Sequence, residues 1–564
     1  MCIRDRSSLI AQPADTSKDA KRGGTLKWTV VSALTTLDPH VMGGSSAVIT
    51  VPVTLSRLTR LKAPVLGKTD GEIVGDLAES LEFSPDRLQL TLKLRQNAAF
   101  APLAPVNGRV MDAQDVVYSW NRYARTGSNR SDYSNAANPL APISSLTATD
   151  NRTIVIKLAY PDATIAALLS APQSGRFNII PREAENYDPR TTLIGTGPYY
   201  LAENTPSVRY VLKRNPGYYD PTRPYIDTVE IPFVQEYATA MAQFRNGAMY
   251  NYGVRQEDVL STKADLPDLN MYQTFAVAVN NNGIKFGYKP TEKGMFRDER
   301  LRQAFSMSID RDTFLDVVAN VSEFRKQGID IETRWHTSTL SDEYKGWWLD
   351  PKSKDFGPNA KYYTHDIAEA KKLVSAAGLT NGPEVISNMA PAGYVTSYPN
   401  LVQVIEGMAK EAGFRFQTNV VDYNTAWSPQ YRDARGNFEG IAHMSLLTLN
   451  TDPVGRMSGI FSSNAGVTFA GFDADGKGNQ AGDPFVDDQF SKARQEIDTE
   501  KRRQTMLELQ RYLGKRQYVL HPVGGASTFS LWWPAVRNVL TVPDEPRHWF
   551  DLWIDETKKP LAKA

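Results

Sequence analysis

Histidine and cysteine are the side chains that most often bind metals in proteins, and this chain has six histidines and one cysteine. The histidines never stand three or four positions apart, so no helix can present two of them to one ion. They are His40, His336, His365, His443, His521 and His548. One cysteine excludes an internal disulfide framework and a zinc site built from several cysteines. We therefore expect no metal site and no cofactor.

Nucleophilic catalysis has equally weak support in the sequence. No serine has glycine both two positions before it and two positions after it, as the nucleophile elbow of an α/β-hydrolase requires. The GTG at 195–197 is followed by Pro198, where a dinucleotide-binding helix should open. The segment 473–478 resembles the start of a calcium loop, but Lys477 and Pro484 stand at ligand positions. A hydrolase whose serine and histidine meet only in the folded chain stays open as an alternative.

The composition is that of a large chain with balanced charge. Its 564 residues exceed the size at which a single core stops growing, which predicts two or three domains. With 64 Lys and Arg against 63 Asp and Glu, electrostatics favours neither nucleic acid nor an anionic membrane as a partner. No apolar stretch approaches the ~20 residues of a membrane helix. Residues 1–22 lack the apolar core of a secretory signal, and we expect a disordered segment or the truncated remnant of a signal.

Strand patterns dominate the first half of the chain. Leucines at 88, 90, 92 and 94 alternate with polar residues, which is the period of a strand with one buried face. Short segments rich in Val, Ile or aromatics predict further strands at 26–31, 153–158, 208–213 and 229–234. Between them, Asp112 begins a predicted helix with apolar residues at helical spacing.

Helical patterns dominate after about residue 295. Apolar stripes predict helices over 301–309, after Asp310, from Asp366 to Gly378, over 490–497, and from Asp498 to about 513. The polar, Gly-rich 473–483 segment is predicted to be an exposed loop. Strand-like residues return at 521–533 and 536–542, which indicates that the chain goes back to its first domain. Tryptophans at 335, 347, 348 and 427 could stack on a ligand or could pack in the second domain.

Eight motifs, in order along the chain, resemble the family 5 solute-binding proteins of ABC importers, typified by dipeptide, oligopeptide and nickel receptors. They are GGTLKW (23–28), LDPH (37–40), GDLAESLEFSPDRLQLTLKLRQNAAF (75–100), DAQDVVYSWNRY (112–123), GTGPYYL (195–201), LKRNPGYYD (212–220), FRDERLRQAFSMSIDRD (296–312) and DIAEAKKLVSAAGL (366–379). The resemblance covers residues 23 to about 545. It implies a ligand-capturing receptor rather than an enzyme.

The resemblance implies an α/β fold of the two-lobed periplasmic-binding-protein (Venus-flytrap) type, with an extra subdomain inserted in lobe I. Lobe I would comprise 23–58, 190–282 and 525–564, the subdomain 59–189, and lobe II 283–524. Ligand capture would proceed by hinge closure, with Asn280, Gly524 and Gly525 as hinge residues. The expected protein is a monomer, periplasmic or lipid-anchored at the cell surface, that delivers its ligand to a membrane permease.

Three family positions that carry charge in peptide receptors are neutral in this chain. The amine-binding Asp is replaced by Leu449, three residues before Asp452-Pro453; the acidic turn near the hinge reads GAMY at 247–250; and 390–400 has no charge. These replacements indicate a less charged ligand: a peptide held by its backbone, or an oligosaccharide bound by the same fold. A hydrolase or chaperone-like protein on this scaffold is the remaining alternative. The candidate ligand contacts are Ser32, Leu34, Tyr250, Asn280, Trp427, Asn450 and Asp452.

Overall fold

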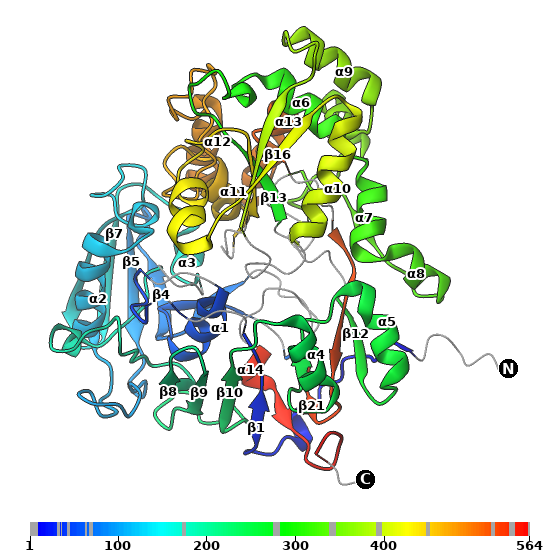
Figure 1. The fold of residues 1–564 in the computed structure, drawn as a ribbon. Helices are drawn as coiled ribbons and strands as arrows, with labels where there is room; N and C mark the ends of the chain where they lie inside the picture. The colour runs from blue at the N-terminus through cyan, green and yellow to red at the C-terminus, as the bar shows by residue number, and fades with distance from the viewer. Residues whose placement is uncertain are drawn as a thin grey trace. The chain divides into compact units, whose positions relative to one another are not determined.

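The structure is a computed structural model of the 564-residue chain. It describes residues 9–30, 34, 36–41, 45–62, 65–66, 72–171, 176–274, 282–337, 346–390, 398–446, 452–520, 525–540 and 548–561. The chain divides into two compact units, neither of which is continuous in sequence (Figure 1). Unit 1 comprises 1–274, 449–452 and 529–564, and unit 2 comprises 275–448 and 453–528. Both units mix helices and sheets, so the predicted α/β class is confirmed.

Two sheets of unit 1 bring together segments that are far apart in sequence. The first has the order β1 (Thr25–Lys27), β10 (Thr228–Pro232), β9 (Arg209–Arg214), β8 (Tyr199–Thr205), with only the β1–β10 pair parallel. The second places β20 (Thr528–Trp532) between β11 (Asn251–Tyr252) and β12 (Asn270–Thr274). Strand-like residues near the end of the chain therefore return to the first unit, as the sequence predicts.

Smaller elements complete this part of unit 1. They are the helices α1 (Ser45–Thr54), α4 (Tyr237–Arg245), α5 (Gln256–Asp265) and α14 (His548–Asp551), the 3-10 turn η2 (Ser17–Asp19), and the strand pair β21 (Val536–Arg537) and β22 (Trp553–Ile554). The predicted strand over 536–542 is therefore shorter than expected, because β21 ends at Arg537.

A four-stranded antiparallel sheet with its own core forms another part of unit 1. Its order is β4 (Ala78–Phe83), β5 (Gln89–Leu94), β7 (Thr153–Leu158), β6 (Ile143–Asp150), and α2 (Ala113–Thr126) lies against it (Figure 1). Three of the four alternating leucines are as predicted, because Leu90, Leu92 and Leu94 are buried in the strand. The prediction is wrong for Leu88, which is exposed and precedes the strand. Neighbouring elements are β2 (Thr59–Leu61), β3 (Ile73–Gly75), α3 (Ile165–Leu168), η3 (Arg130–Asp132) and η4 (Arg182–Glu185).

Unit 2 is built on a five-stranded sheet that the sequence did not predict. Its order is β16 (Arg415–Val420), β15 (Glu384–Met389), β17 (Ile441–Ser445), β13 (Asn282–Phe286), β18 (Val519–Leu520). β15 is parallel to both β16 and β17, whereas β13 is antiparallel to both β17 and β18. A two-stranded pair, β14 (Thr333–Arg334) with β19 (Gly525–Ala526), also belongs to unit 2.

Helices make up most of the remainder of unit 2. They are α6 (Glu299–Met307), α7 (Arg311–Ala319), α8 (Val321–Lys326), α9 (Ile367–Ala376), α10 (Tyr398–Glu411), α11 (Pro453–Phe461), α12 (Pro484–Gln495) and α13 (Thr499–Arg516), with the short turns η5 (Met295–Arg297), η6 (Lys354–Phe356) and η7 (Pro358–Tyr363) and the π-helical η8 (Tyr423–Arg432). Asp310, Asp366 and Asp498 cap α7, α9 and α13 as predicted.

Two local expectations in unit 2 are wrong. The helix expected over 490–497 ends at Gln495, and Ile497 is exposed. The Gly-rich loop is not exposed throughout, because Asp473 and Asp483 at its two ends are buried. Asp473 accepts hydrogen bonds from two backbone N–H groups of the loop, and Asp483 caps α12. Asp473 therefore helps to hold the loop's shape, and Asp483 holds the start of the helix that follows it.

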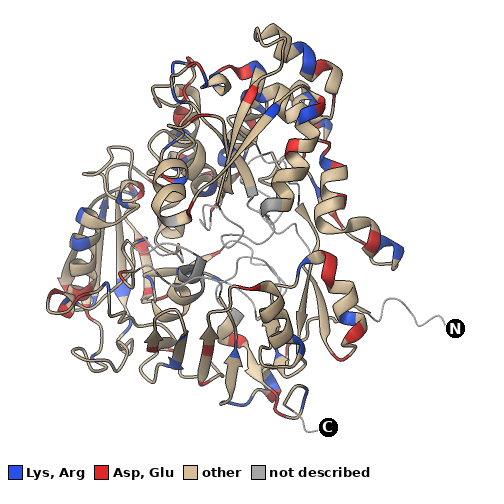
Figure 2. Cartoon of the chain, viewed as in Figure 1, with Lys and Arg blue, Asp and Glu red and all other residues tan. Residues whose placement is uncertain are grey.

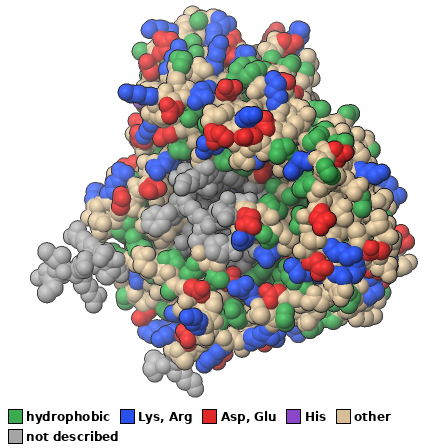
Figure 3. All heavy atoms as spheres, turned by 180° about the vertical axis from the view of Figure 1, so that it is seen from behind, with side chains coloured by type: hydrophobic (Ala, Val, Ile, Leu, Met, Phe, Trp, Pro, Cys, Tyr) green, Lys and Arg blue, Asp and Glu red, His purple; other side chains and the backbone are tan. Residues whose placement is uncertain are grey.

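Charge is mixed along the elements of both units. Figure 2 shows acidic and basic side chains interspersed rather than segregated by sign. The face drawn in Figure 3 has small groups of hydrophobic side chains between charged ones. Among the described residues, no helix combines the length and the apolar character needed to cross a lipid bilayer.

Candidate functional site

Two of the predicted contact residues, Trp427 and Asp452, lie on connections at one end of the unit 2 sheet. The parallel strands β15, β16 and β17 all finish at this end, as does β18, and β13 begins there. From β15 the chain continues to β16 on one side and then to β17 on the other, so the strand order reverses at β15. In open α/β sheets, ligands bind outside the carboxyl ends of the strands at such a reversal. We call this region the carboxyl end of the unit 2 sheet.

Of the predicted residues on the connections at this end, two are described. Trp427 lies in η8, which follows β16, and Asp452 directly precedes Pro453, the first residue of α11. Asn280, Asn450 and Gly524 lie outside the described residues. In the sequence, Asn280 precedes β13, Asn450 follows β17, and Gly524 follows β18. Their roles as ligand contacts or hinge residues stay predictions.

Trp427 is fully buried and packs inside unit 2. Its indole stacks on the Tyr431 ring, with centroids 5.3 Å apart and an interplanar angle of 26°. The Tyr431 hydroxyl accepts from the Asn419 amide at 3.2 Å, and the same amide donates to Asn388 at 2.9 Å. Contacts therefore run from β15 through β16 to η8. In the described part of the chain the Trp427 Nε1–H has no acceptor.

Asp452 is half-buried at the start of α11. A carboxylate before a helix is stabilised by the N-terminal end of the helix dipole. The position can therefore hold a negative charge beside a ligand, as the peptide-receptor interpretation needs. Whether Asp452 contacts a ligand stays a prediction.

The fold brings together one serine and one histidine that no motif in the sequence connects. The Ser387 hydroxyl on β15 lies 3.1 Å from Nε2 of His443 on β17, and both side chains are buried. Burial lowers the pKa of His443 to about 3, so the imidazole is neutral at physiological pH. Among the described residues no carboxylate hydrogen-bonds to His443. The orienting acid of a catalytic triad is thus lacking in this part of the structure.

Two predicted contacts in unit 1 are described. The Leu34 N–H donates to the Tyr210 hydroxyl at 2.6 Å. Tyr250 connects two segments through its backbone: its N–H donates to the Lys27 carbonyl at 3.1 Å, and its carbonyl accepts from the Trp533 N–H at 3.0 Å. Burial is the main cause that raises the pKa of the Tyr250 hydroxyl, so the phenol stays neutral. Ser32 lies outside the described residues.

The predicted hinge glycine Gly525 is buried in β19 and pairs with Arg334 of β14. In the division into units, the chain passes from one unit to the other after 274, 448, 452 and 528. The predicted lobe boundaries and the hinge role of Gly525 stay predictions.

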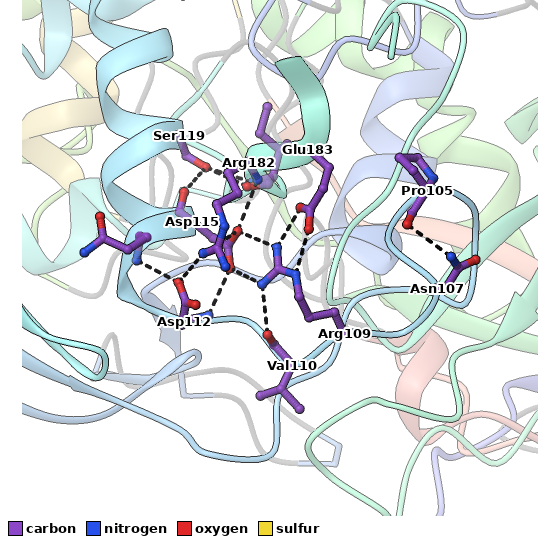
Figure 4. A network of polar contacts seen from close by, with 11 residues as sticks. Pro105, Asn107, Arg109, Val110, Asp112, Asp115, Ser119, Arg182 and Glu183 are labelled. Atoms are coloured by element: carbon purple, nitrogen blue, oxygen red, sulfur yellow. Dashed lines mark hydrogen bonds and ion pairs between the residues drawn. The ribbon is translucent and has the colours of Figure 1, made fainter. Parts of the chain in front are cut away.

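An ion network in unit 1, which the sequence did not reveal, serves the fold (Figure 4). Two nitrogens of the Arg109 guanidinium donate to the Asp115 carboxylate at 2.8 and 2.9 Å, and Arg109 also forms two hydrogen bonds with Glu183. These carboxylates raise the pKa of Arg109. Arg182 pairs with Asp112, the N-cap of α2, at 2.6 Å. The network ties the start of α2 to η4.

The described residues include no group of three or more His, Cys, Asp or Glu side chains arranged to hold a metal ion. His521 lies outside these residues.

Mixed α/β units with a strand-order reversal define a class of binding fold, and the comparisons specify the family. The model of the bacterial extracellular solute-binding proteins, family 5 (middle region), matches residues 72–467. The chain belongs to this family, whose members are solute-binding receptors found outside the cytoplasm.

Curated relatives are about a quarter identical to the chain over the regions that align. A Brucella ovis protein named for ABC transporter peptide binding is 26% identical over 370 residues, which are 64% of this chain and 62% of that protein. The periplasmic oligopeptide-binding protein OppA of Salmonella typhimurium is 27% identical over 405 residues, 66% of this chain and 67% of OppA. The chain thus matches less than two thirds of the length of the first of these relatives.

Solved structures confirm the fold over nearly the whole chain. The periplasmic binding protein DppA from Helicobacter pylori, in complex with the peptide STSA, has a TM-score of 0.75 at 20% identity and covers 95% of this chain and 99% of its own. AgaA from A. tumefaciens, in complex with agropinic acid, has a TM-score of 0.74 at 21% identity and covers 94% and 99%. The periplasmic-binding-protein fold expected from the motifs is confirmed.

Proposed function

We propose that this protein is the solute-binding receptor of an ABC importer, that it captures a peptide-like ligand, and that it delivers the ligand to a membrane permease. The family match over residues 72–467 is the observation that carries the proposal. Relatives named for peptide or oligopeptide binding favour a peptide over other solutes. A ligand that contacts both units would favour the closed arrangement by the difference between its affinities for the two states.

The neutral residues at these family positions narrow the chemical class of the ligand further. Leu449 and the 247–250 turn replace acidic residues of peptide receptors, while Asp452 keeps one carboxylate near the carboxyl end of the unit 2 sheet. We therefore infer a peptide bound mainly through its backbone, with its amino group near Asp452. A monomer held in the periplasm or on the cell surface fits this role.

Two alternatives have weaker support. The hydrolase alternative rests on Ser387 and His443, and among the described residues their pair has no carboxylate partner. The oligosaccharide alternative requires an aromatic face for a sugar, and the Trp427 face is stacked on Tyr431. Oligosaccharide binding is therefore kept as an outcome of the test.

The first test is a thermal-shift screen of the purified chain against pools of peptides of two to nine residues, cello- and xylo-oligosaccharides, and nickel chelates. A ligand that binds only the native state raises stability by about 2.7 kcal/mol at a hundredfold excess over Kd. We expect the peptide pools alone to raise Tm. A shift with oligosaccharides alone, or with none of the three classes, would contradict the proposal.

A matched pair of variants then tests Asp452. The Asp452→Asn variant should weaken binding of a peptide with a free amino terminus and leave the N-acetylated form of the same peptide unaffected, because the acetylated peptide has no ammonium group to pair. Asp350→Asn, at a half-buried aspartate of unit 2, is the control. Calorimetric titration of both peptides measures the difference. Equal losses for both peptides would refute the role given to Asp452.

A further inference from the structure

The Gly-rich loop 473–483 of unit 2 has the backbone turn of a calcium loop. An EF-hand loop takes ligands from positions 1, 3, 5, 7, 9 and 12 and turns sharply at a glycine in position 6. Counted from Asp473, position 3 is Asp475 and position 6 is Gly478. Gly478 has a φ of 77°, in the left-handed region that such a turn favours. The backbone thus matches the sequence pattern at these positions.

The loop folds back over its first carboxylate. Oδ2 of Asp473 accepts hydrogen bonds from the N–H groups of Gly478 and Asn479 at 2.6 and 3.0 Å. Its other oxygen, Oδ1, is buried and has no hydrogen-bond donor among the described residues. Asp473 is only 6% exposed, and buried carboxylate oxygens normally have a partner. Oδ1 is therefore suited to interact with a positive charge.

Contacts at both ends of the loop hold it in place. The Phe472 ring stacks on the Tyr518 ring, with centroids 3.7 Å apart. Asp483 accepts a hydrogen bond from the Tyr518 hydroxyl at 2.8 Å. The Ala474 N–H donates to the Gly482 carbonyl at 2.9 Å, which closes the loop at its base. The charged residues between these contacts then determine the shape of the middle of the loop.

A lysine stands at position 5, where a calcium loop has another oxygen ligand. The Lys477 ammonium lies 2.7 Å from one oxygen of the Asp475 carboxylate, and the Lys477 N–H donates to the other oxygen at 3.1 Å. The hydrogen bond with Asp475 is the main cause that raises the pKa of Lys477, and the charge of Asp473 adds to it. The ammonium therefore interacts with the carboxylates at positions 1 and 3.

The last position of the loop also departs from a calcium site. Position 12, where a bidentate Glu completes the coordination of calcium, is Pro484, the first residue of α12. The two carboxylates of Asp473 and Asp475 are therefore accompanied by a lysine instead of further acidic ligands. A covalently attached ammonium in this position needs no metal to balance part of their charge.

We propose that the Lys477 ammonium takes the place of a divalent cation in this loop, which keeps the turn of a calcium loop and supplies its own positive charge. Replacing the lysine by an acidic residue should therefore convert the loop into a calcium site. The inference does not depend on the proposed function, because none of these residues is a candidate ligand contact.

The first test compares the wild type with Lys477→Asp by differential scanning fluorimetry in calcium chloride and in EDTA. The wild type should have the same Tm in both. Lys477→Asp removes the ammonium and adds a carboxylate at position 5, so its Tm should fall in EDTA and rise with calcium, with half of the rise at about 0.1 to 1 mM. A rise of similar size in the wild type, or none in the variant, would overturn the proposal.

A matched lysine controls for calcium binding to exposed acids in general. Lys372 pairs with Glu369 on α9, and the two side chains are 74% and 41% exposed, against 74% and 44% for Lys477 and Asp475. Lys372→Asp makes the same change of charge outside the loop and should show no rise in Tm with calcium. Equal rises in Lys372→Asp and Lys477→Asp would refute a site formed by the loop.

The second test examines the loop itself, with variants that add no negative charge. Lys477→Met keeps a long side chain without the ammonium, and hydrogen exchange of peptides that span 471–483 should become about two- to fivefold faster in EDTA, as expected for the loss of an exposed ion pair. Lys477→Arg keeps the charge and should exchange as the wild type does. If Lys477→Met also exchanges as the wild type does, the ammonium does not support the loop and the proposal fails.

Discussion

The buried histidine His443 makes the stability of unit 2 sensitive to acid. It lies on β17 against Ser387 and is 3% exposed. Burial lowers its pKa from 6.5 to about 3. Between these two pH values, His443 binds a proton in the unfolded chain but stays neutral in the folded chain. The free energy of unfolding therefore carries the full contribution of His443 above pH 6.5 and loses it progressively as the pH falls toward 3.

The size of the loss follows from the two pKa values. At pH 5 the unfolded histidine is almost wholly protonated and the folded one almost wholly neutral, so moving from pH 7 to pH 5 costs about 2 kcal/mol. His40 and His336 are also fully buried, each with a pKa lowered to about 4 chiefly by burial. His336 and His443 together predict a loss of about 4 kcal/mol for unit 2 in this interval, and His40 a loss of about 2 kcal/mol for unit 1.

The assay is urea denaturation, followed by circular dichroism, at pH 7 and pH 5. The variant His443→Gln can still hydrogen-bond to Ser387 but cannot take up the proton, so its loss of stability should be about 2 kcal/mol smaller than that of the wild type. His365→Gln, at an exposed histidine of unit 2, is the control and should change as the wild type does. Equal losses in the wild type and His443→Gln would refute the reasoning.

The remaining predictions concern the stability of the fold. Arg109→Met should lower the free energy of unfolding by about 2 to 4 kcal/mol, because it leaves the fully buried Asp115 without its bidentate partner. Arg190→Met, in a solvent-exposed ion pair, should cost much less, and equal costs in urea denaturation would contradict the importance of the network. Gly471→Ala should lower Tm more than Gly357→Ala: both glycines have positive φ, but a Cβ at 471 would lie 1.7 Å from a backbone oxygen, whereas one at 357 meets nothing within 4 Å. Equal shifts in differential scanning fluorimetry would show that the close approach is relieved at no cost.

Local patterns in the sequence predicted the elements whose stability is local. The alternating leucines of β5 appear as a strand with one buried face, and Asp112, Asp310 and Asp498 begin helices where the capping rule places them. Each of these signals needs only a few neighbouring residues. The motifs in turn predicted the family and the fold, which the comparisons confirm.

The unit 2 sheet escaped prediction because its strands are short and paired over long distances. β16 reads Arg-Phe-Gln-Thr-Asn-Val and lies at the edge of the sheet with no fully buried residue, so it has no strong alternation. β17 contains His443, whose hydrogen-bond partner Ser387 lies 56 positions away in the sequence. The ion network around Arg109 was hidden for the same reason, since Glu183 lies 74 positions away.

The candidate site was predicted only in outline. Residue types and motifs pointed to the connections around Trp427 and Asp452, and these follow β16 and precede α11 at the carboxyl end of the unit 2 sheet. The sequence did not predict that Trp427 would stack on Tyr431, because π-helical segments such as η8 have no simple pattern. The role of each residue in ligand binding stays a prediction.

The strand order in the second sheet of unit 1 determines when during translation this sheet can form. Its middle strand β20 is synthesised only after residues 275–527, whereas β11 and β12 are synthesised before them. At 5 to 20 residues per second this delay lasts roughly 10 to 50 s. Throughout that interval the nascent first unit has two strands waiting for a partner. The second sheet of unit 1 therefore cannot be complete until translation is nearly over.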